Sequence, residues 1–106
     1  PAACAYTISK WGMRGFTLGL AKSLIPYDIV VNGIAPGPTI TPMTKNSNNG
    51  DYYLGNNPTK RYATSTEIAN MATILVSNMC RCVVGDILCM TGGAGVITFD
   101  DINYNF

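Results

Sequence analysis

The chain has 106 residues, a formal net charge of +1 and no histidine; 47% of its residues are hydrophobic and 12% are charged. This length suits one small domain, and the composition is typical of a folded chain with a core. Scattered basic residues exclude a nucleic-acid surface, and the absence of histidine excludes Ser-His-Asp and Cys-His catalysis and histidine-ligated metal sites within this chain.

The first predicted element is a helix from about Ala3 to Leu24. Pro26 closes it, because proline cannot continue the helical hydrogen bonds. Leu18, Ala21 and Ile25 continue one apolar stripe along this segment. Tyr6, Lys10 and Trp11 lie near the beginning of this stripe.

Three glycines lie three and four positions apart in the same segment, at Gly12, Gly15 and Gly19. Each costs about 1 kcal/mol relative to alanine inside a helix. Such a stripe of bare backbone is expected where another element approaches the helix closely. The alternative interpretation is a merely weak helix.

Tyr6 and Lys10 lie four positions apart near the start of this helix. Residues at that spacing share one helix face, with Cβ atoms roughly 5–6 Å apart. A tyrosine is a poor acid or base at neutral pH, and a neighbouring cation favours its phenolate form. On spacing alone, a packed ring beside a solvated amine is the commoner arrangement. The segments that follow favour an acid/base pair.

A short apolar run, Asp28 to Ala35, predicts a buried parallel strand that the sequence Pro36-Gly37-Pro38 ends. From Thr39 to about Arg61 the chain is polar, rich in turn-forming residues and predicted to be irregular. A loop of this length in a compact domain is usually functional or mobile.

A second helix is predicted from about Ser65 to Ser77, because Thr64 and Glu67 have the spacing of a capping box. Val83 to Met90 is the second predicted strand, and Gly92-Gly93 ends it. The order helix, strand, long loop, helix, strand indicates an α/β parallel sheet. Two strands alone do not form a stable sheet, so the missing strands must come from an absent segment of the same protein or from another chain.

Apolar stretches in the chain are short and interrupted, so no segment is expected to span a bilayer, and no secretory signal is visible. The cysteines are Cys4, Cys80, Cys82 and Cys89, and their spacing does not match a zinc site. We interpret them as reduced structural thiols of a cytoplasmic protein without a metal site. A thiol-based metal or redox module is the alternative, and it depends on the cysteines alone.

Four sequence blocks occur in order: Tyr6-x-x-x-Lys10 with Ser9 before the lysine, VVNGIAPGPTITPM at 30–43, RYATSTEIA at 61–69 and VVGDILCMTGGAG at 83–95. Together they resemble the C-terminal part of the short-chain dehydrogenase/reductase family. The resemblance implies the C-terminal portion of a Rossmann-like, doubly wound parallel α/β sheet that is incomplete in this chain. Residues 1–106 would then be the C-terminal catalytic half of the domain, with a lid loop at about 39–61.

The resemblance further implies an enzyme that uses NAD or NADP to interconvert an alcohol and a carbonyl by hydride transfer. Tyr6 matches the family's general acid/base, next to the nicotinamide. Lys10 matches the lysine that promotes ionisation of this tyrosine and binds the nicotinamide ribose.

Four more residues match the family's cofactor-binding positions. Pro36 and Gly37 match the turn that brings backbone against the nicotinamide ring. Thr39 stands where the main chain contacts the carboxamide, although the family usually has Ile or Val there. Thr41 matches the threonine near the carboxamide and the diphosphate, and Thr44 to Asn57 would be the mobile substrate lid.

The family's glycine-rich phosphate loop, its catalytic serine and the residue that selects NAD or NADP would all lie upstream of this sequence. Gly92-Gly93-Ala94-Gly95 does not substitute for the loop, because no helix follows it to present amide donors. We therefore expect the chain alone to be inactive and the substrate to remain unidentified beyond a small alcohol or carbonyl compound.

Family members are usually homo-dimers or homo-tetramers, so the chain is expected to pack against further subunits or against a missing N-terminal half. An alternative function follows from the same point. The chain would be a truncated, non-catalytic product that acts only as a subunit-packing or partner-binding fragment.

Overall fold

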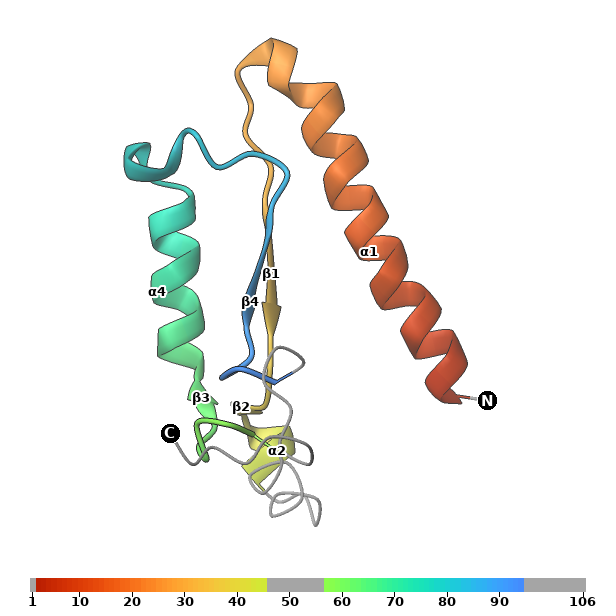
Figure 1. The fold of residues 1–106 in the computed structure, drawn as a ribbon, viewed down its shortest axis with the longest axis vertical. Coiled ribbons are helices and arrows are strands. Elements are labelled where there is room, and N and C mark those ends of the chain that lie inside the picture. The colour runs from red at the N-terminus through yellow and green to blue at the C-terminus, as the bar shows by residue number, and fades with distance from the viewer. Residues whose placement is uncertain (1, 46–56, 95–106) are drawn as a thin grey trace, which may run out of the picture. The chain divides into compact units, whose positions relative to one another are not determined.

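The computed structural model describes residues 2–45 and 57–94, and the fold is given for these residues. Figure 1 shows the elements, which are α1 (Ala2–Leu24), a 3-10 helix (Ile25–Tyr27), β1 (Gly33–Pro36), β2 (Thr39–Ile40), α2 (Pro42–Lys45), β3 (Ala63–Thr64), α4 (Ser65–Leu75), a second 3-10 helix (Asn78–Cys80) and β4 (Ile87–Met90). These residues form two compact units: 2–34 with 72–88, and 35–45 with 57–71 and 89–94.

Helix α1 of the first unit has the predicted extent, and proline follows its end inside the first 3-10 helix. Its buried residues are Thr17 and Ala21, which lie one turn apart. Of the apolar stripe noted in the sequence, Ala21 is buried, whereas Leu18 and Ile25 are exposed. The contact face of α1 runs through Thr17 and Ala21 instead.

The residues that approach α1 closely are glycines of other segments in the same unit. A Cβ added to Gly85 would lie 3.3 Å from the Ala21 Cβ, and one on Gly33 would lie 3.6 Å from the Thr17 Cγ2. A Cβ on Gly12, Gly15 or Gly19 would meet nothing within 4 Å. No described residue therefore makes the approach that the glycine stripe predicted.

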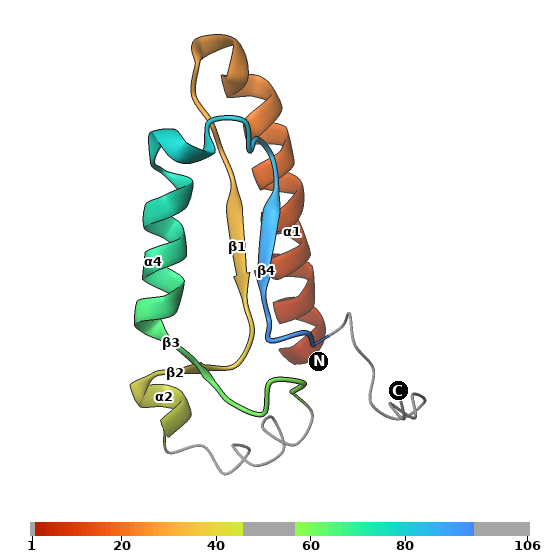
Figure 2. The ribbon, with the colours of Figure 1, turned by 60° about the vertical axis from the view of Figure 1, so that its left-hand side comes forward.

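Strands β1 and β4 lie side by side (Figure 2) and form a two-stranded sheet. The Gly33 amide donates to the Asp86 carbonyl at 2.8 Å, and the Gly37 amide donates to the Met90 carbonyl at 3.0 Å. The partner number rises together with the residue number, so the strands run parallel, as predicted.

Both strands begin later than predicted, because a side chain replaces part of the backbone ladder. The Asn32 Nδ2 donates to the Val83 carbonyl at 2.7 Å, and its Oδ1 accepts the Asp86 amide at 3.0 Å. Gly85 has a φ of 69°, a left-handed conformation that interrupts an extended strand. The Asn32 side chain thus joins the segments that precede β1 and β4, before regular strand pairing starts.

The second unit is more ordered than the polar composition of 39–61 predicted. β2 pairs with β3 in parallel, with Thr39 opposite Ala63 and Ile40 opposite Thr64. α2 follows β2 directly. The remainder of the predicted lid, at positions 46–56, lies outside the described residues.

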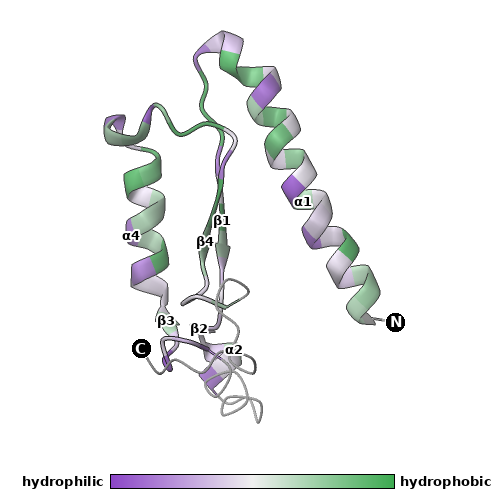
Figure 3. Cartoon of the chain, in the orientation of Figure 1, coloured by the Kyte–Doolittle hydropathy of each residue, from purple (hydrophilic) through white to green (hydrophobic). Residues whose placement is uncertain are grey.

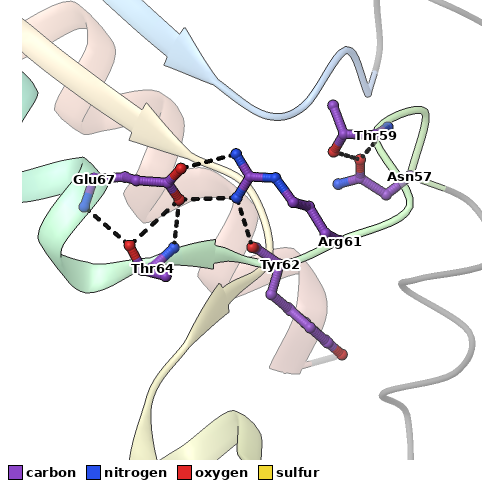
Figure 4. A network of polar contacts seen from close by, with 6 residues as sticks. All are labelled: Asn57, Thr59, Arg61, Tyr62, Thr64 and Glu67. Atoms are coloured by element: carbon purple, nitrogen blue, oxygen red, sulfur yellow. Dashed lines mark hydrogen bonds and ion pairs between the residues drawn. The ribbon is translucent and has the colours of Figure 1, made fainter.

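The predicted capping box at the start of α4 is confirmed (Figure 4). The Thr64 Oγ1 accepts the Glu67 amide at 3.1 Å, and the Glu67 Oε2 accepts the Thr64 amide at 2.8 Å. The helix ends at Leu75, two residues before the predicted end. There Ser77 turns back, donating its hydroxyl to the Ile74 carbonyl at 2.6 Å and accepting the Met79 amide.

Arg61 reinforces this cap by binding both carboxylate oxygens of Glu67, at 2.8 and 3.0 Å (Figure 4). The same guanidinium donates to the Tyr62 carbonyl at 3.2 Å. Hydrogen bonds from Arg61 and from the Thr64 amide to the carboxylate lower the pKa of Glu67 to about 2. A single carboxylate therefore links the chain before β3 to the first turn of α4.

Hydrophobic residues lie along α1, β1 and β4, as Figure 3 shows, yet few are covered. Among the described residues, Ala21 is the one buried hydrophobic residue, at 3% exposure, whereas Trp11 is 67% exposed. Thr17 and Asn57 are the buried polar residues in the same part of the chain. The predicted incompleteness of the sheet thus extends to the core.

The Glu67 carboxylate gives a pH-dependent stability at the start of α4. Because folding lowers its pKa, this stabilisation is present above the ordinary pKa of 4.5 and is lost as the pH falls toward about 2. We expect the far-UV circular dichroism of the protein to lose helical signal in that range. Glu67→Gln should remove this component of the pH dependence and lower helicity at pH 7. An identical acid transition in both proteins would contradict the prediction.

Candidate active site

Tyr6 and Lys10 come together on α1, as their spacing predicted. The Lys10 Nζ lies 5.5 Å from the centroid of the Tyr6 ring, which is cation–π geometry. The Tyr6 side chain is accessible, with 64% of the residue exposed. The two groups therefore share one face and are open to a ligand, while their chemical role stays a prediction.

Other polar groups on α1 do not join this pair. The Ser9 hydroxyl donates to the Tyr6 carbonyl at 2.7 Å, so it bonds to the helix backbone. Arg14 lies over the Trp11 ring at 6.0 Å from its centroid, a second cation–aromatic pair on the same helix. Proximity of a cation to a ring is thus not by itself a catalytic feature, and the family match has to supply the distinction.

The predicted cofactor turn lies at the end of β1, in the second unit. Gly37 donates its amide to the Met90 carbonyl, and a Cβ on Gly37 would lie 2.8 Å from the Thr91 Cα. Real Cβ atoms essentially never approach backbone that closely. Glycine is therefore required here by the packing of the turn against the end of β4.

Thr39 holds the same turn with its side chain. Its Oγ1 donates to the Gly37 carbonyl at 2.9 Å, and its own carbonyl accepts the Thr44 hydroxyl at 2.7 Å. The hydroxyl, which distinguishes Thr39 from the usual Ile or Val, thus bonds within the turn.

Thr41 caps α2. The Thr41 Oγ1 accepts the Thr44 amide at 3.2 Å, and the Thr44 Oγ1 accepts the Thr41 amide at 2.8 Å. Thr44 was expected to begin the mobile lid, and this reciprocal cap was not predicted. Thr41 followed by Pro42 and by a polar residue at Thr44 is a helix-start signal that would have identified it.

A buried polar cluster adjoins the turn, and sequence analysis did not predict it. Asn57, only 4% exposed, donates its Nδ2 to the Thr91 carbonyl at 3.2 Å. Its Oδ1 accepts the Thr59 amide at 3.0 Å and the Thr59 hydroxyl at 2.7 Å (Figure 4). Asn57 was predicted as a turn-former at the end of the lid, whereas the structure makes it a fixed internal anchor.

The six predicted site residues therefore form two groups. Tyr6 and Lys10 belong to the first unit, and Pro36, Gly37, Thr39 and Thr41 belong to the second. A hollow of about 400 Å³ in the first unit is lined by other residues, which include Val30, Asn32, Ile34, Leu75 and Arg81. At its rim, Arg81 and Asp28 form a 2.6 Å ion pair.

The four cysteines form no disulfide, and Cys4, Cys82 and Cys89 are exposed rather than buried. Residues 2–45 and 57–94 hold no cluster of three or more His, Cys, Asp or Glu side chains suited to a metal ion. Within those ranges, the helices fall short of the length and hydropathy that a membrane span needs.

Comparison with known proteins identifies relatives along most of the chain. A family model described as enoyl-(acyl carrier protein) reductase matches residues 1–95. The 3-oxoacyl-(acyl-carrier-protein) reductase of Buchnera aphidicola subsp. Baizongia pistaciae is 38% identical over 90 residues, covering 83% of this chain and 37% of the relative. Trans-4-hydroxycyclohexanecarboxylate dehydrogenase of Sinomonas cyclohexanicum is 37% identical, covering 84% of this chain and 33% of the relative.

Solved structures of other proteins also resemble this chain. A short-chain dehydrogenase/reductase mutant from Serratia marcescens is 32% identical with a TM-score of 0.81, covering 86% of this chain and 38% of that one. A blue fluorescent protein from a metagenomic library, in complex with NADPH, is 30% identical with a TM-score of 0.81, covering 85% and 37%. A Brucella melitensis 3-oxoacyl-(acyl-carrier-protein) reductase with bound NAD is 32% identical with a TM-score of 0.79, covering 90% and 34%. The chain thus spans little more than a third of these proteins.

The tight packing at Gly37 yields a stability prediction. Gly37→Ala would place a methyl group against the Thr91 backbone, and such overpacking typically costs about 1–3 kcal/mol of unfolding free energy. Gly33→Ala is the matched control, because its nearest neighbour would be the flexible Ile87 side chain at 3.3 Å. Urea denaturation of both variants in the full-length protein measures the difference. Equal stability of the two variants would disprove the packing argument.

Proposed function

The chain belongs to the short-chain dehydrogenase/reductase family, and we propose that it is the C-terminal catalytic part of an NAD(P)-dependent oxidoreductase that interconverts an alcohol and a carbonyl. The observation that carries this proposal is the Tyr6–Lys10 pair. An ammonium lies 5.5 Å from the ring centre of an accessible tyrosine, within the segment that the family model matches.

In the proposed reaction, bound NAD or NADP accepts or supplies the hydride. The Tyr6 Oη takes the proton of the substrate hydroxyl during oxidation and returns it to the oxygen during reduction. The Lys10 ammonium lies on the same helix face, 5.5 Å from the centre of the Tyr6 ring, as the electrostatic partner of this residue.

The family resemblance assigns residues of both units to the nicotinamide end of the cofactor. Tyr6 and Lys10 are exposed, and Pro36, also exposed, ends β1 at a turn that contacts within the chain keep in place. Lys10 would bind the ribose, and Pro36, Gly37 and Thr39 would bring their backbone against the nicotinamide group. Thr41 would lie near the carboxamide and the diphosphate. The choice between NAD and NADP stays open, because similar structures hold one or the other.

The substrate class is an alcohol or carbonyl compound. The two relatives compared above are named for a 3-oxoacyl reductase and a hydroxycyclohexanecarboxylate dehydrogenase. These names share oxo–hydroxyl interconversion but differ in the rest of the substrate. The proposal therefore extends to the reaction and not to one compound.

We further propose that the protein is cytoplasmic and assembles as a homo-dimer or homo-tetramer, or onto an N-terminal half. Exposed apolar residues on α1, including Trp11, Met13 and Phe16, support such assembly, since a large exposed apolar surface marks an interaction site. Exposed thiols without a disulfide fit a reducing compartment.

Tyr6→Phe in the full-length protein tests the catalytic role. The variant lacks the dissociable proton, so kcat should fall by about 10²–10⁴-fold, the usual contribution of general acid–base catalysis. Binding of NADH or NADPH and the melting temperature should change little. Tyr27→Phe, at another exposed tyrosine of the same unit, is the matched control and should keep full activity. Retained turnover in Tyr6→Phe would remove this residue from the mechanism.

A second candidate function is a non-catalytic fragment that only packs against other subunits. One observation favours it: Ala21 is the one hydrophobic residue buried within the described ranges. A chain with so little core needs a partner to fold, whether or not it contributes to catalysis.

Titration of both the purified 106-residue chain and the full-length protein with NADH separates the two functions. We expect no binding by fluorescence, because the phosphate loop is not in this sequence, and weak near-ultraviolet circular dichroism beside retained far-ultraviolet signal. The full-length protein should bind NADH or NADPH and turn over an alcohol or carbonyl. Failure of the full-length protein to bind either cofactor would favour the fragment function.

A further inference from the structure

We propose that Asn57 is a positioning residue for the cofactor turn, defined here as Pro36-Gly37-Pro38, and that it acts through Thr91. The inference rests on the proposed function, because it assumes that this turn contacts the nicotinamide group. All of these residues lie in the second unit.

The first step is the contact between the turn and Thr91. Gly37 lies so close to the Thr91 backbone that an added Cβ would be 2.8 Å from its Cα and 3.2 Å from its carbonyl oxygen. The Gly37 amide also donates a hydrogen bond, at 3.0 Å, to the carbonyl of Met90, the residue before Thr91. A displacement of Thr91 would therefore displace the cofactor turn, since close-packed atoms transmit small shifts.

The second step is the bond that holds Thr91. Its carbonyl accepts the Asn57 Nδ2 at 3.2 Å and the Ala94 amide at 3.4 Å. The second of these is a long contact inside a turn. Asn57 is thus the side chain that ties the end of β4 to the segment preceding β3.

The third step is the fixed orientation of the Asn57 amide. Its oxygen accepts two donors from Thr59, and its nitrogen faces a carbonyl. Reversing the amide would set donors against donors and oxygen against oxygen, so the hydrogen bonds determine its orientation. Because the residue is 4% exposed, water cannot readily replace a lost bond.

The packing around this anchor is equally tight. Gly92 has a φ of 66°, and a Cβ there would lie 2.5 Å from the Asn57 Oδ1 and from the Thr59 Oγ1. The backbone of the Thr91–Gly92 turn therefore fits directly under the asparagine. Gly37, which packs against the Thr91 backbone, and Gly92, which follows Thr91 in the chain, are both required for this arrangement.

Asn57→Asp in the full-length protein tests the proposal. The substitution keeps the shape and the acceptor for Thr59, but it places an oxygen against the Thr91 carbonyl. We expect the affinity for NADH or NADPH to fall about tenfold, the scale of one buried hydrogen bond replaced by an unfavourable contact. The affinity for ADP-ribose, which lacks the nicotinamide, should stay within about twofold of the wild-type value.

Two further variants complete the test. Thr59→Val removes one bond to Asn57 but keeps the bond from Asn57 to Thr91, so its NADH affinity should change less than about threefold. Asn57→Ala removes the amide without a buried charge and repeats the test if Asn57→Asp does not fold.

Equal weakening of NADH and ADP-ribose, or no change in either, would overturn the positioning role. Wild-type protein that binds neither NADH nor NADPH would instead contradict the proposed function. The two failures are therefore distinguishable in one set of titrations.

Discussion

The shortage of buried hydrophobic surface is the constraint on which the rest of this structure depends. Apolar burial is the main favourable term in folding, yet Ala21 is the one hydrophobic residue buried in the described ranges. Polar links take its place locally: Asn32 joins two chain segments, Glu67 caps α4 and Asn57 ties Thr91. Such bonds fix local geometry without replacing a core. The chain also spans only 37% and 33% of the two curated relatives compared, so each of them has further residues with no counterpart in this sequence.

A feature of the fold was predictable from the sequence when the residues that determine it lie close together along the chain. The extent of α1 and the start of α4 were predictable, because proline and a capping box act within a few residues. Parallel pairing followed from the element order. The later starts of β1 and β4 were not predictable, because Asn32 bonds Val83, a residue 51 positions away. The end of α4 was also predicted too late. There the Ser77 hydroxyl bonds to the Ile74 carbonyl, and the composition of the segment does not indicate this bond.

The candidate site divides in the same way. Tyr6 and Lys10 meet because a helix places positions four apart on one face, which needs no tertiary information. The reciprocal Thr41–Thr44 cap was readable but missed, since the polar composition of that region suggested a loop. The Asn57 anchor depends on Thr91, 34 positions away, and no sequence signal marks it. Residues that only position the residues of a site are thus harder to predict from the sequence than residues that form the surface of the site.

Contacts within the described residues explain some glycines of this chain and leave others unexplained. Gly37 and Gly92 are required by contacts within the second unit, where a side chain would strike Thr91 or Asn57. Gly12, Gly15 and Gly19 meet no neighbour within 4 Å, although each weakens α1 by about 1 kcal/mol relative to alanine. Nothing in the described chain offsets that cost. An element that packs closely on the glycine face of α1 would offset it, and the exposed Trp11 and Phe16 on the same helix would add apolar area to the contact. Both features therefore assign the completion of this fold to residues outside the described part of the chain.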